Sequence, residues 1–477
     1  MTNWRPDLSQ GVGPLYLKLA ARIEDDIQSG VLPAGAKLPP QRNLAFDIGV
    51  TIGTVGRAYA LVRERGLVSG EVGRGTYVLG RGAADEAGAG ATSDAGAPSA
   101  MTDSLRTARP VAGKIRMDST AAPDVGQGPT LERLMSELIK EHPHEAATYT
   151  RQWPAAWVEA GRSWLSAGDW RPDAGGIVPT LGGHAAILAV IAAVTQPGDK
   201  VAFEQLTFAS IARSTNLIGR RVVAMETPDG TITPDAFERL CAQQHPKLVF
   251  LMPTVQNPTL DIVSEADRHA IVAIARKYNV WLLEDNIYGS LLDDGPVMLA
   301  ELAPDRTFHL GGLSKVVSAG VRGGWVWCPS NFAPRVMTAH KMITGGLPFM
   351  LGELAARLVM SGEAGAVRSR VKAEIAARER LARRHFEGLD FVSHPATPFL
   401  WMKLPDPWLS GNFKKAGEDE GVLVDDEDEF KGGRSEQAFH RIRVSFTVPK
   451  GHAEVERGFA AIRRLVDSGD VGHVSYS

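Results

Sequence analysis

The stretch GGLSKVVSAGVRGGW, residues 311–325, places one lysine and one arginine among small residues. It lies between two apolar runs, RTFHLGG at 306–312 and GGWVWCP at 323–329, and each run predicts a buried strand. Lys315 and Arg322 therefore belong to a connection at the end of a strand. Because ligands bind beyond the carboxyl ends of strands in open α/β sheets, this connection is a candidate binding site.

Further apolar runs, separated by helical or turn sequence, continue this pattern toward the N-terminus. They include KLVFLMP at 247–253 and VWLLED at 280–285. Such alternation predicts a mostly parallel sheet with helices on both faces. Asp285 ends the second run, Tyr288 follows three residues later, and Asn257 lies beyond the first run. We expect these side chains to gather at one edge of the sheet.

Two interpretations of these residues are open. Asp285 and Lys315 can form an ion pair with a structural role only, since a buried carboxylate needs a cation. The other interpretation adds TLGGHAAILAV at 180–190, a Gly-rich turn entering a helix, whose N–H groups favour an anion such as phosphate. Arg322 suits bidentate phosphate binding. A nucleophilic amine, a carboxylate, an amide, a phenol and an anion site together match the needs of pyridoxal 5'-phosphate.

The motifs TLGGHAA, QNPT, EDNIYG, LSKVVSAGVRGG and RIRVSF occur in this order and resemble those of fold-type I aminotransferases over residues 114–470. The resemblance implies that fold, with pyridoxal 5'-phosphate as cofactor. It implies that Lys315 is the catalytic residue that bonds the cofactor, that Asp285 pairs with the ring nitrogen, and that Arg443 binds a carboxylate of the substrate or effector. The implied cofactor-binding residues are Gly182, Gly183, His184, Phe208, Asn257, Asp285, Tyr288, Ser314, Lys315 and Arg322.

Several of these residues have a plainer interpretation when each is taken alone. Phe208 is typical of a core aromatic, His184 of a hydrogen-bonding residue at a helix start, and Arg443 of an exposed strand residue. The acidic run DDEDEF at 425–430 is typical of a solvated surface, and it would repel acidic effectors if it bordered the site.

The first eighty residues predict a small separate domain. Apolar residues recur at every fourth position from Leu15 to Ile27, and Gly30 follows, which predicts an amphipathic helix with a glycine cap. Residues 42–66 then predict a short helix, a tight turn around Gly49 and a second helix, and residues 67–80 predict a hairpin. A small helical bundle with a hairpin fits these patterns as well as a winged helix-turn-helix does.

The segments LPPQRNLAFDIGVTIGTVGRAY and GRGTYV, at 38–59 and 73–78, resemble the winged helix-turn-helix of the GntR family. The resemblance implies binding to double-stranded DNA, with the helix from Thr51 in the major groove. Ile52 and Gly53 stand where the family usually has an arginine and a polar residue. The implied DNA-binding residues are Arg42, Thr51, Thr54, Arg57, Arg74 and Gly75. A GntR-like head joined to an aminotransferase-like body resembles the MocR subfamily of bacterial transcription regulators.

Composition sets the remaining bounds. Residues 81–113 are rich in Ala, Gly and Ser and predict a flexible linker between a head at 1–80 and a body at 114–477. A net charge of -3 argues against a polybasic nucleic-acid binder throughout, so a DNA contact would be local. Two cysteines make neither a disulfide framework nor a zinc site, and we expect no metal and a cytoplasmic protein. We see no signal peptide and no apolar run long enough for a bilayer, and expect no membrane.

Three functional hypotheses follow. In the first, the chain is a homodimeric transcription regulator in which an amino compound displaces Lys315 from the cofactor and changes DNA binding. In the second, it is a working aminotransferase acting on an amino acid, with a weak DNA-binding head, and Ile52 and Gly53 favour this hypothesis slightly. In the third, the body is a structural fold without cofactor.

Overall fold

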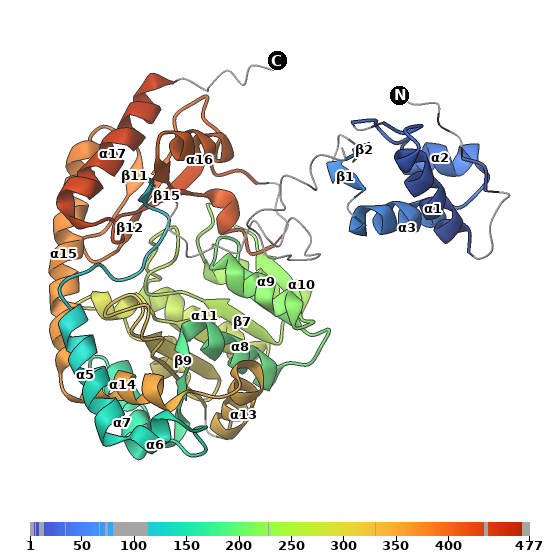
Figure 1. Cartoon of the computed structure of the whole chain (residues 1–477). Coiled ribbons are helices and arrows are strands. Elements are labelled where there is room, and N and C mark those ends of the chain that lie inside the picture. The colour runs from blue at the N-terminus through green and yellow to red at the C-terminus, as the bar shows by residue number, and fades with distance from the viewer. Residues whose placement is uncertain are drawn as a thin grey trace. The chain divides into compact units, whose positions relative to one another are not determined.

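The computed structural model describes residues 4, 6–8, 14–33, 35–65, 67–71, 75–79, 113–227, 229–329, 331–433 and 437–469. The chain divides into two compact units, one within Met1–Thr107 and the other within Ala108–Ser477 (Figure 1). The linker expected at 81–113 lies outside the described residues except for Gly113, so its bounds stay a prediction.

The head is a three-helix unit with a hairpin. Leu19, Ile23 and Val55 are fully buried in its hydrophobic core, because the four-residue repeat places α1 against α3. Gly49 adopts a φ of +68° in the turn before α3, which suits glycine. The expected helix-turn-helix and hairpin are both present. The elements are α1 Leu15–Gln28, α2 Gln41–Asp47, α3 Ile52–Glu64, β1 Val68–Glu71 and β2 Gly75–Val78.

The body is built on a seven-stranded sheet with the order β4-β10-β9-β8-β7-β5-β6. Only β10 runs antiparallel to its neighbours β4 and β9, so the sheet is mostly parallel, as the sequence predicts. The strands are β4 Ile177–Thr180, β5 Lys200–Glu204, β6 Arg221–Met225, β7 Leu248–Leu251, β8 Trp281–Asp285, β9 Thr307–Gly312 and β10 Gly324–Trp327.

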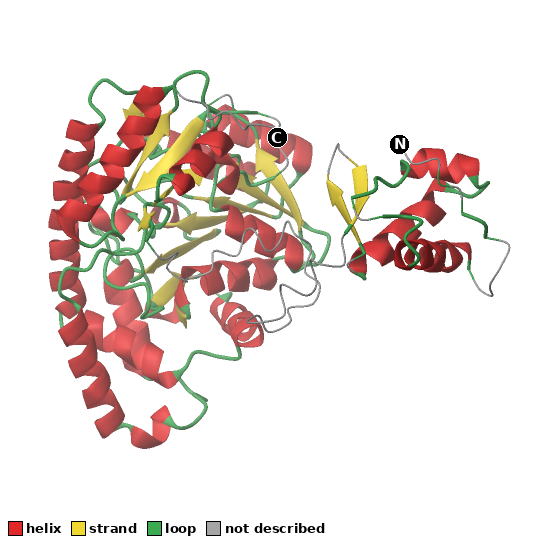
Figure 2. Ribbon diagram, turned by 45° about the horizontal axis from the view of Figure 1, so that its top comes forward, coloured by secondary structure: helices red, strands yellow, loops and turns green. Residues whose placement is uncertain are grey.

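Helices cover both faces of this sheet (Figure 2). Alternate side chains of one strand enter two different hydrophobic clusters, because successive strand residues point to opposite faces. Phe250 of β7 belongs to one cluster, whereas its neighbours Val249 and Leu251 belong to the other. The helices are α5 Gly128–Glu141, α6 Pro143–Ala146, α7 Ala155–Leu165, α8 Gly182–Val194, α9 Ala209–Leu217, α10 Pro234–Gln244, α11 Glu265–Lys277, α12 Leu299–Leu302, α13 Ala333–Thr344 and α14 Phe349–Met360, with short 3-10 turns η1 Ala174–Gly176 and η2 Gly289–Leu291.

The C-terminal part adds a smaller antiparallel sheet with the order β11-β12-β15-β14. Helix α15, Glu363–His385, runs along the body from α14 to α17 and connects the two sheets (Figure 1). The parallel pair of β3 and β13 ties residues near 115 to this part of the chain. Its elements are β3 Ile115–Arg116, β11 Phe391–Val392, β12 Phe399–Lys403, α16 Ser410–Asp419, β13 Val422–Leu423, β14 Asp425–Asp426, η3 Glu427–Glu429, β15 Arg441–Ser445 and α17 Gly451–Ser468.

Candidate functional site

The candidate site lies where several strands of the large sheet end. Asp285 is the last residue of β8 and is in register with Leu310 of β9, and Lys315 follows three residues after β9 ends. Helix α8 begins directly after β4. The sheet topology therefore brings the predicted amine, carboxylate and anion site to one edge.

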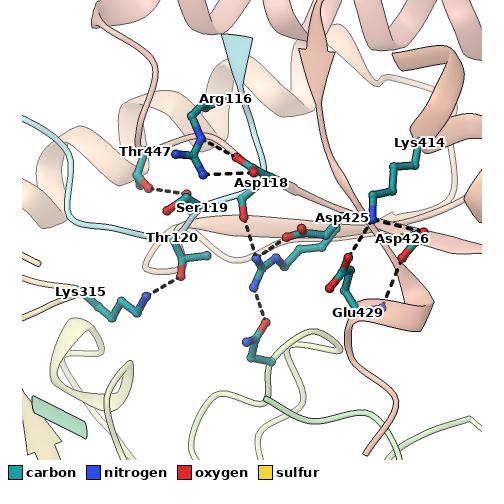
Figure 3. Close-up of polar contacts among 12 residues, drawn as sticks. Arg116, Asp118, Ser119, Thr120, Lys315, Lys414, Asp425, Asp426, Glu429 and Thr447 are labelled. Carbon is teal, nitrogen blue, oxygen red and sulfur yellow. Dashed lines mark hydrogen bonds and ion pairs between the residues drawn. The ribbon is translucent and has the colours of Figure 1, made fainter. Parts of the chain in front are cut away.

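Lys315 and Tyr288 meet through a threonine. Lys315 Nζ donates a hydrogen bond of 2.9 Å to Thr120 Oγ1 (Figure 3). The same Oγ1 lies 2.8 Å from the Tyr288 hydroxyl. Thr120 and Tyr288 are both buried. Thr120 thus fixes the positions of the amine and the phenol relative to each other.

Asp285 is a buried carboxyl at the end of β8. Burial raises its pKa to about 6, and the Ile287 N–H and the charge of Lys315 oppose this increase. Its Oδ1 accepts the Ile287 N–H at 3.0 Å. Because the apolar surroundings disfavour the charged form, a protonated ring nitrogen beside this carboxylate would be a favourable partner.

The predicted phosphate site is formed by the start of α8 and by Arg322. Gly182 has a φ of +78°, and a Cβ there would lie 3.4 Å from the Arg322 Cζ and from its carbonyl oxygen, so glycine allows this close approach. Arg322 is exposed, and its Nη2 lies 3.5 Å from the Leu181 carbonyl oxygen. Gly183 follows in the first turn of α8, where N–H groups and the helix dipole favour an anion.

His184 and Phe208 lie beside this turn. Their rings are 6.0 Å apart and nearly perpendicular, and His184 Nε2 lies 3.2 Å from Ser214 Oγ. Burial lowers the pKa of His184, and the charge of Arg322 lowers it further. Phe208 packs partly buried against the core. Their roles toward a cofactor, like that of half-buried Ser314, stay predictions.

Arg443 lies on β15 and is only 4% exposed, so the interpretation as an exposed strand residue is wrong. Its Nη1 donates to Asn257 Oδ1 at 2.8 Å, and its Nη2 donates to the Asp118 carbonyl oxygen at 3.3 Å. Nη2 also forms an ion pair and hydrogen bond with Asp425 Oδ2. The structure thus brings Asn257 and Arg443 together, although 186 positions separate them in sequence.

The expectation that the acidic run at 425–430 is a solvated surface is wrong for its first half. Asp425, Asp426 and Glu427 are 2%, 9% and 3% exposed, respectively. The reason is that β14 pairs with β15, which carries these carboxyl groups inward. Cations compensate the buried charge, because Arg443 contacts Asp425 and Lys414 contacts Asp426 and Glu429 (Figure 3).

Three buried residues at the site were not predicted from the sequence. Thr120 lies in the irregular segment after β3, where no periodic pattern marks it. His340 of α13 accepts the Leu181 N–H at 2.9 Å through Nε2, and burial lowers its pKa to about 4, so it is neutral. Glu204 ends β5, accepts the Met252 N–H at 3.0 Å, and burial raises its pKa to about 8. A charged residue at the end of an apolar run was the available signal for Glu204.

The predicted DNA-binding residues lie on the head. Thr51 caps α3, where its Oγ1 accepts the Thr54 N–H at 3.2 Å. Arg57 is exposed on α3, with its guanidinium 6.0 Å from the centre of the Tyr16 ring. Arg42 belongs to α2 and Gly75 to β2, and Arg74 lies outside the described residues. DNA contacts of these residues stay predictions.

The described ranges contain neither a helix suited to crossing a membrane nor a cluster of side chains placed to hold a metal ion. No helix within them is long and apolar enough to cross a membrane. Within the same ranges, no group of three or more His, Cys, Asp or Glu side chains is placed to hold a metal ion.

Comparisons with known proteins give related solved structures for the body. An archaeal alanine:glyoxylate aminotransferase is 22% identical with a TM-score of 0.66, and the match covers 74% of this chain and 91% of that chain. LysN, an α-aminoadipate aminotransferase from Thermus thermophilus solved with N-(5'-phosphopyridoxyl)-L-leucine, is 18% identical with a TM-score of 0.67, and the match covers 78% and 95%. These likenesses show the fold.

Whole-length relatives are similar across both units. YdeF of Bacillus subtilis strain 168, described as an uncharacterized HTH-type transcriptional regulator, is 27% identical over 469 residues, which are 98% of this chain and 97% of the relative. YjiR of Escherichia coli K12, described in the same words, is 25% identical over 416 residues, which are 82% and 86%.

Family models match both units of the chain. Residues 15–78 match the model of bacterial regulatory proteins of the gntR family, and residues 123–456 match the model of class I and II aminotransferases. The aminotransferase family and its solved neighbours imply pyridoxal 5'-phosphate as cofactor. Since a gntR head in front of such a body is the MocR architecture, this chain belongs to the class I and II aminotransferase family as a protein of MocR type.

Proposed function

We propose that this chain is a transcription regulator that binds DNA through its head and binds pyridoxal 5'-phosphate and an amino compound in its body. The observation that carries the proposal is the combination of a gntR head with a body in which Lys315 and Asp285 lie at the same sheet edge and interact through charge. A protein that binds the chromosome would work in the cytoplasm.

The residues of the site fit the cofactor. Asp285 is a buried carboxyl with a raised pKa, which a protonated ring nitrogen would compensate. Gly182 leaves room for the close approach of Arg322 beside the start of α8, which suits a phosphate group. When bound, the cofactor supplies an aldehyde that bonds reversibly to amines.

Each predicted cofactor-binding residue has a role in this proposal. Lys315 would offer its Nζ to the aldehyde and could move a proton at that atom, and Thr120 Oγ1 accepts a hydrogen bond of 2.9 Å from this Nζ. Asp285 would keep the ring nitrogen protonated. Asn257 and Tyr288 would bind the ring hydroxyl, and Phe208 would cover the ring face. The phosphate would be held by Gly182, Gly183, His184, Ser314 and Arg322.

We further propose that the protein acts as a homodimer. Helix α13 carries three exposed apolar side chains, since Met337, Met342 and Ile343 are 42%, 72% and 40% exposed. Covering them in a second copy would remove this apolar surface from water. Two heads would suit DNA half-sites about 34 Å apart.

The test is DNA binding by the full chain loaded with cofactor, measured by gel shift with and without a panel of amines. We expect at least one amine to change the affinity for DNA, and Lys315→Ala to abolish that change. Arg57→Ala should weaken DNA binding at every amine concentration, and Arg63→Ala, at the exposed far end of α3, is its charge-matched control. Identical DNA binding with and without every amine would contradict the proposed regulatory function.

A working aminotransferase is the alternative, because Lys315 is placed for proton transfer. Steady-state turnover with an amino donor and a keto acid separates the two functions. Sustained turnover combined with DNA binding that ignores amines would favour the enzyme.

A further inference from the structure

Arg443 has its hydrogen-bonding fork occupied by the protein itself. A guanidinium offers a carboxylate two double-donor edges, Nη1 with Nη2 and Nε with Nη2, so both edges include Nη2. In this structure Nη2 donates to the Asp118 carbonyl oxygen and to the Asp425 carboxylate, which uses both of its hydrogens. Asp425 therefore occupies the position that a ligand carboxylate would need.

Two aromatic rings also lie near the guanidinium. The Phe399 ring lies 5.3 Å and the Phe430 ring 4.7 Å from its central carbon. Side chains of Arg443 and Asp425 are 5% and 3% exposed, so water screens this pair little. The pair is neutral in sum, and a ligand carboxylate meets no net positive charge there.

Displacing Asp425 from Arg443 would break a buried ion pair, which is costly. Two other cations of this region, Lys414 and Arg116, bind other carboxylates. Lys414 bonds Glu429 at 2.8 Å and contacts Asp426 at 3.5 Å, and Arg116 forms a two-pronged pair with Asp118 (Figure 3). Asp425 also interacts with Lys414 through its charge, but its hydrogen-bonded ion pair is with Arg443.

The pair of Arg443 and Asp425 is close enough to Lys315, along the chain segment that contacts both, to affect which ligands bind there. The segment 118–120 joins both ends, since the carbonyl of Asp118 accepts from Arg443 and the hydroxyl of Thr120 accepts from Lys315. A small amine that displaces Lys315 from the cofactor would therefore have Arg443 nearby, at the other end of this segment. The Arg443 Nε–H is buried without a hydrogen-bond partner among the described residues, and a single donor suits a neutral carbonyl oxygen.

We propose that Asp425 makes the site selective for amino compounds without a carboxylate next to the amine, such as amino amides. This inference rests on the proposed binding of an amino compound, and it modifies the expected role of Arg443. Asp425 supplies from within the protein the carboxylate that an α-amino acid would bring. Arg443 then offers hydrogen bonds to a neutral end of the ligand.

The test uses matched acid and amide pairs on the cofactor-loaded full chain. Alanine, leucine and phenylalanine are each compared with their amides, so that side-chain fit cancels within a pair. Binding is measured by cofactor absorbance and by calorimetry. For the unaltered chain, we consider each pair in which the acid binds. In such a pair we expect the amide to bind about tenfold or more tightly than the acid, which corresponds to one hydrogen bond to a charged group. Equal or tighter binding of the acids would overturn the assignment.

Asp425→Asn is the matching variant, since an amide oxygen still accepts from Nη2 while the negative charge is removed. We expect acid binding to strengthen about tenfold or more and amide binding to change little. Asp428→Asn is the control, because it removes one charge from the same acidic run at a side chain that is 71% exposed. If acid binding strengthens in neither variant, Asp425 is not the determinant. Should Asp425→Asn fail to fold, the acid and amide pairs on the unaltered chain decide alone.

Failure of the inference differs from failure of the proposed function. Amides that bind tightly without changing DNA binding would overturn the regulator and leave the assignment of Asp425 standing. Acids that bind more tightly than amides and change DNA binding would overturn the assignment of Asp425 and leave the regulator standing. No binding by either class would overturn both.

Discussion

Replacing Asp285 by asparagine should stabilise the protein without cofactor and weaken cofactor binding. Burial raises the pKa of this carboxyl from 3.8 to about 6. One pKa unit corresponds to about 1.4 kcal/mol, so the ionised carboxylate destabilises the folded state by about 3 kcal/mol. Asparagine removes the charge and keeps an oxygen that can accept the Ile287 N–H. We expect a net gain of about 2–3 kcal/mol in the free energy of unfolding at pH 7.5.

The pH dependence gives the sign of this effect. Because the folded pKa lies above the unfolded one, the folded state binds the proton more tightly, and stability falls as pH rises between the two values. The penalty is absent below about pH 3.8 and complete above about pH 6. The advantage of Asp285→Asn should therefore shrink to about half at pH 5 compared with pH 7.5.

Urea denaturation of the full chain without cofactor, followed by tryptophan fluorescence at both pH values, measures this difference. Asp294→Asn is the control, because Asp294 is an exposed carboxyl close by in sequence. Cofactor affinity, measured by equilibrium dialysis, should fall in Asp285→Asn by about 3 kcal/mol, roughly 100-fold, since the ring nitrogen loses its charged partner. A variant less stable than the natural protein at pH 7.5, or a difference that ignores pH, would refute the reasoning.

Three further substitutions follow from named contacts. Thr120→Val leaves the buried Tyr288 hydroxyl without this 2.8 Å partner and should cost about 1–3 kcal/mol in urea denaturation, whereas Thr120→Ser should stay near the natural value. Arg268→Ala removes a fully buried guanidinium that donates hydrogen bonds to several backbone carbonyls. The free energy of unfolding should fall by about 3–5 kcal/mol. A variant as stable as the natural protein would show that those carbonyls find other donors. Thr51→Ala removes the cap that accepts the Thr54 N–H, and the free energy of unfolding of the head, measured by thermal denaturation, should fall by about 1 kcal/mol with no change in the body.

The sequence predicts the position of a site residue where one short segment shows both the strand and the residue at its end. An apolar run that ends in Asp285, and another that leads into the connection holding Lys315, place both residues at a strand end, because strands of a parallel sheet end on one side. The same holds for the head, in which the repeat from Leu15 and the turn at Gly49 gave the helices. These patterns are local, and burial of one helix or strand face imposes them directly.

Only the tertiary structure decided which charges are buried and which groups pair. Asp425 belongs to a run that composition assigns to a surface, and it is buried because β14 pairs with β15 and carries it to Arg443. Thr120 reaches Lys315 across 195 positions of sequence. Such contacts leave no periodic trace in the sequence, because the energy that holds a buried charge or hydroxyl comes from a partner that folding delivers from elsewhere in the chain.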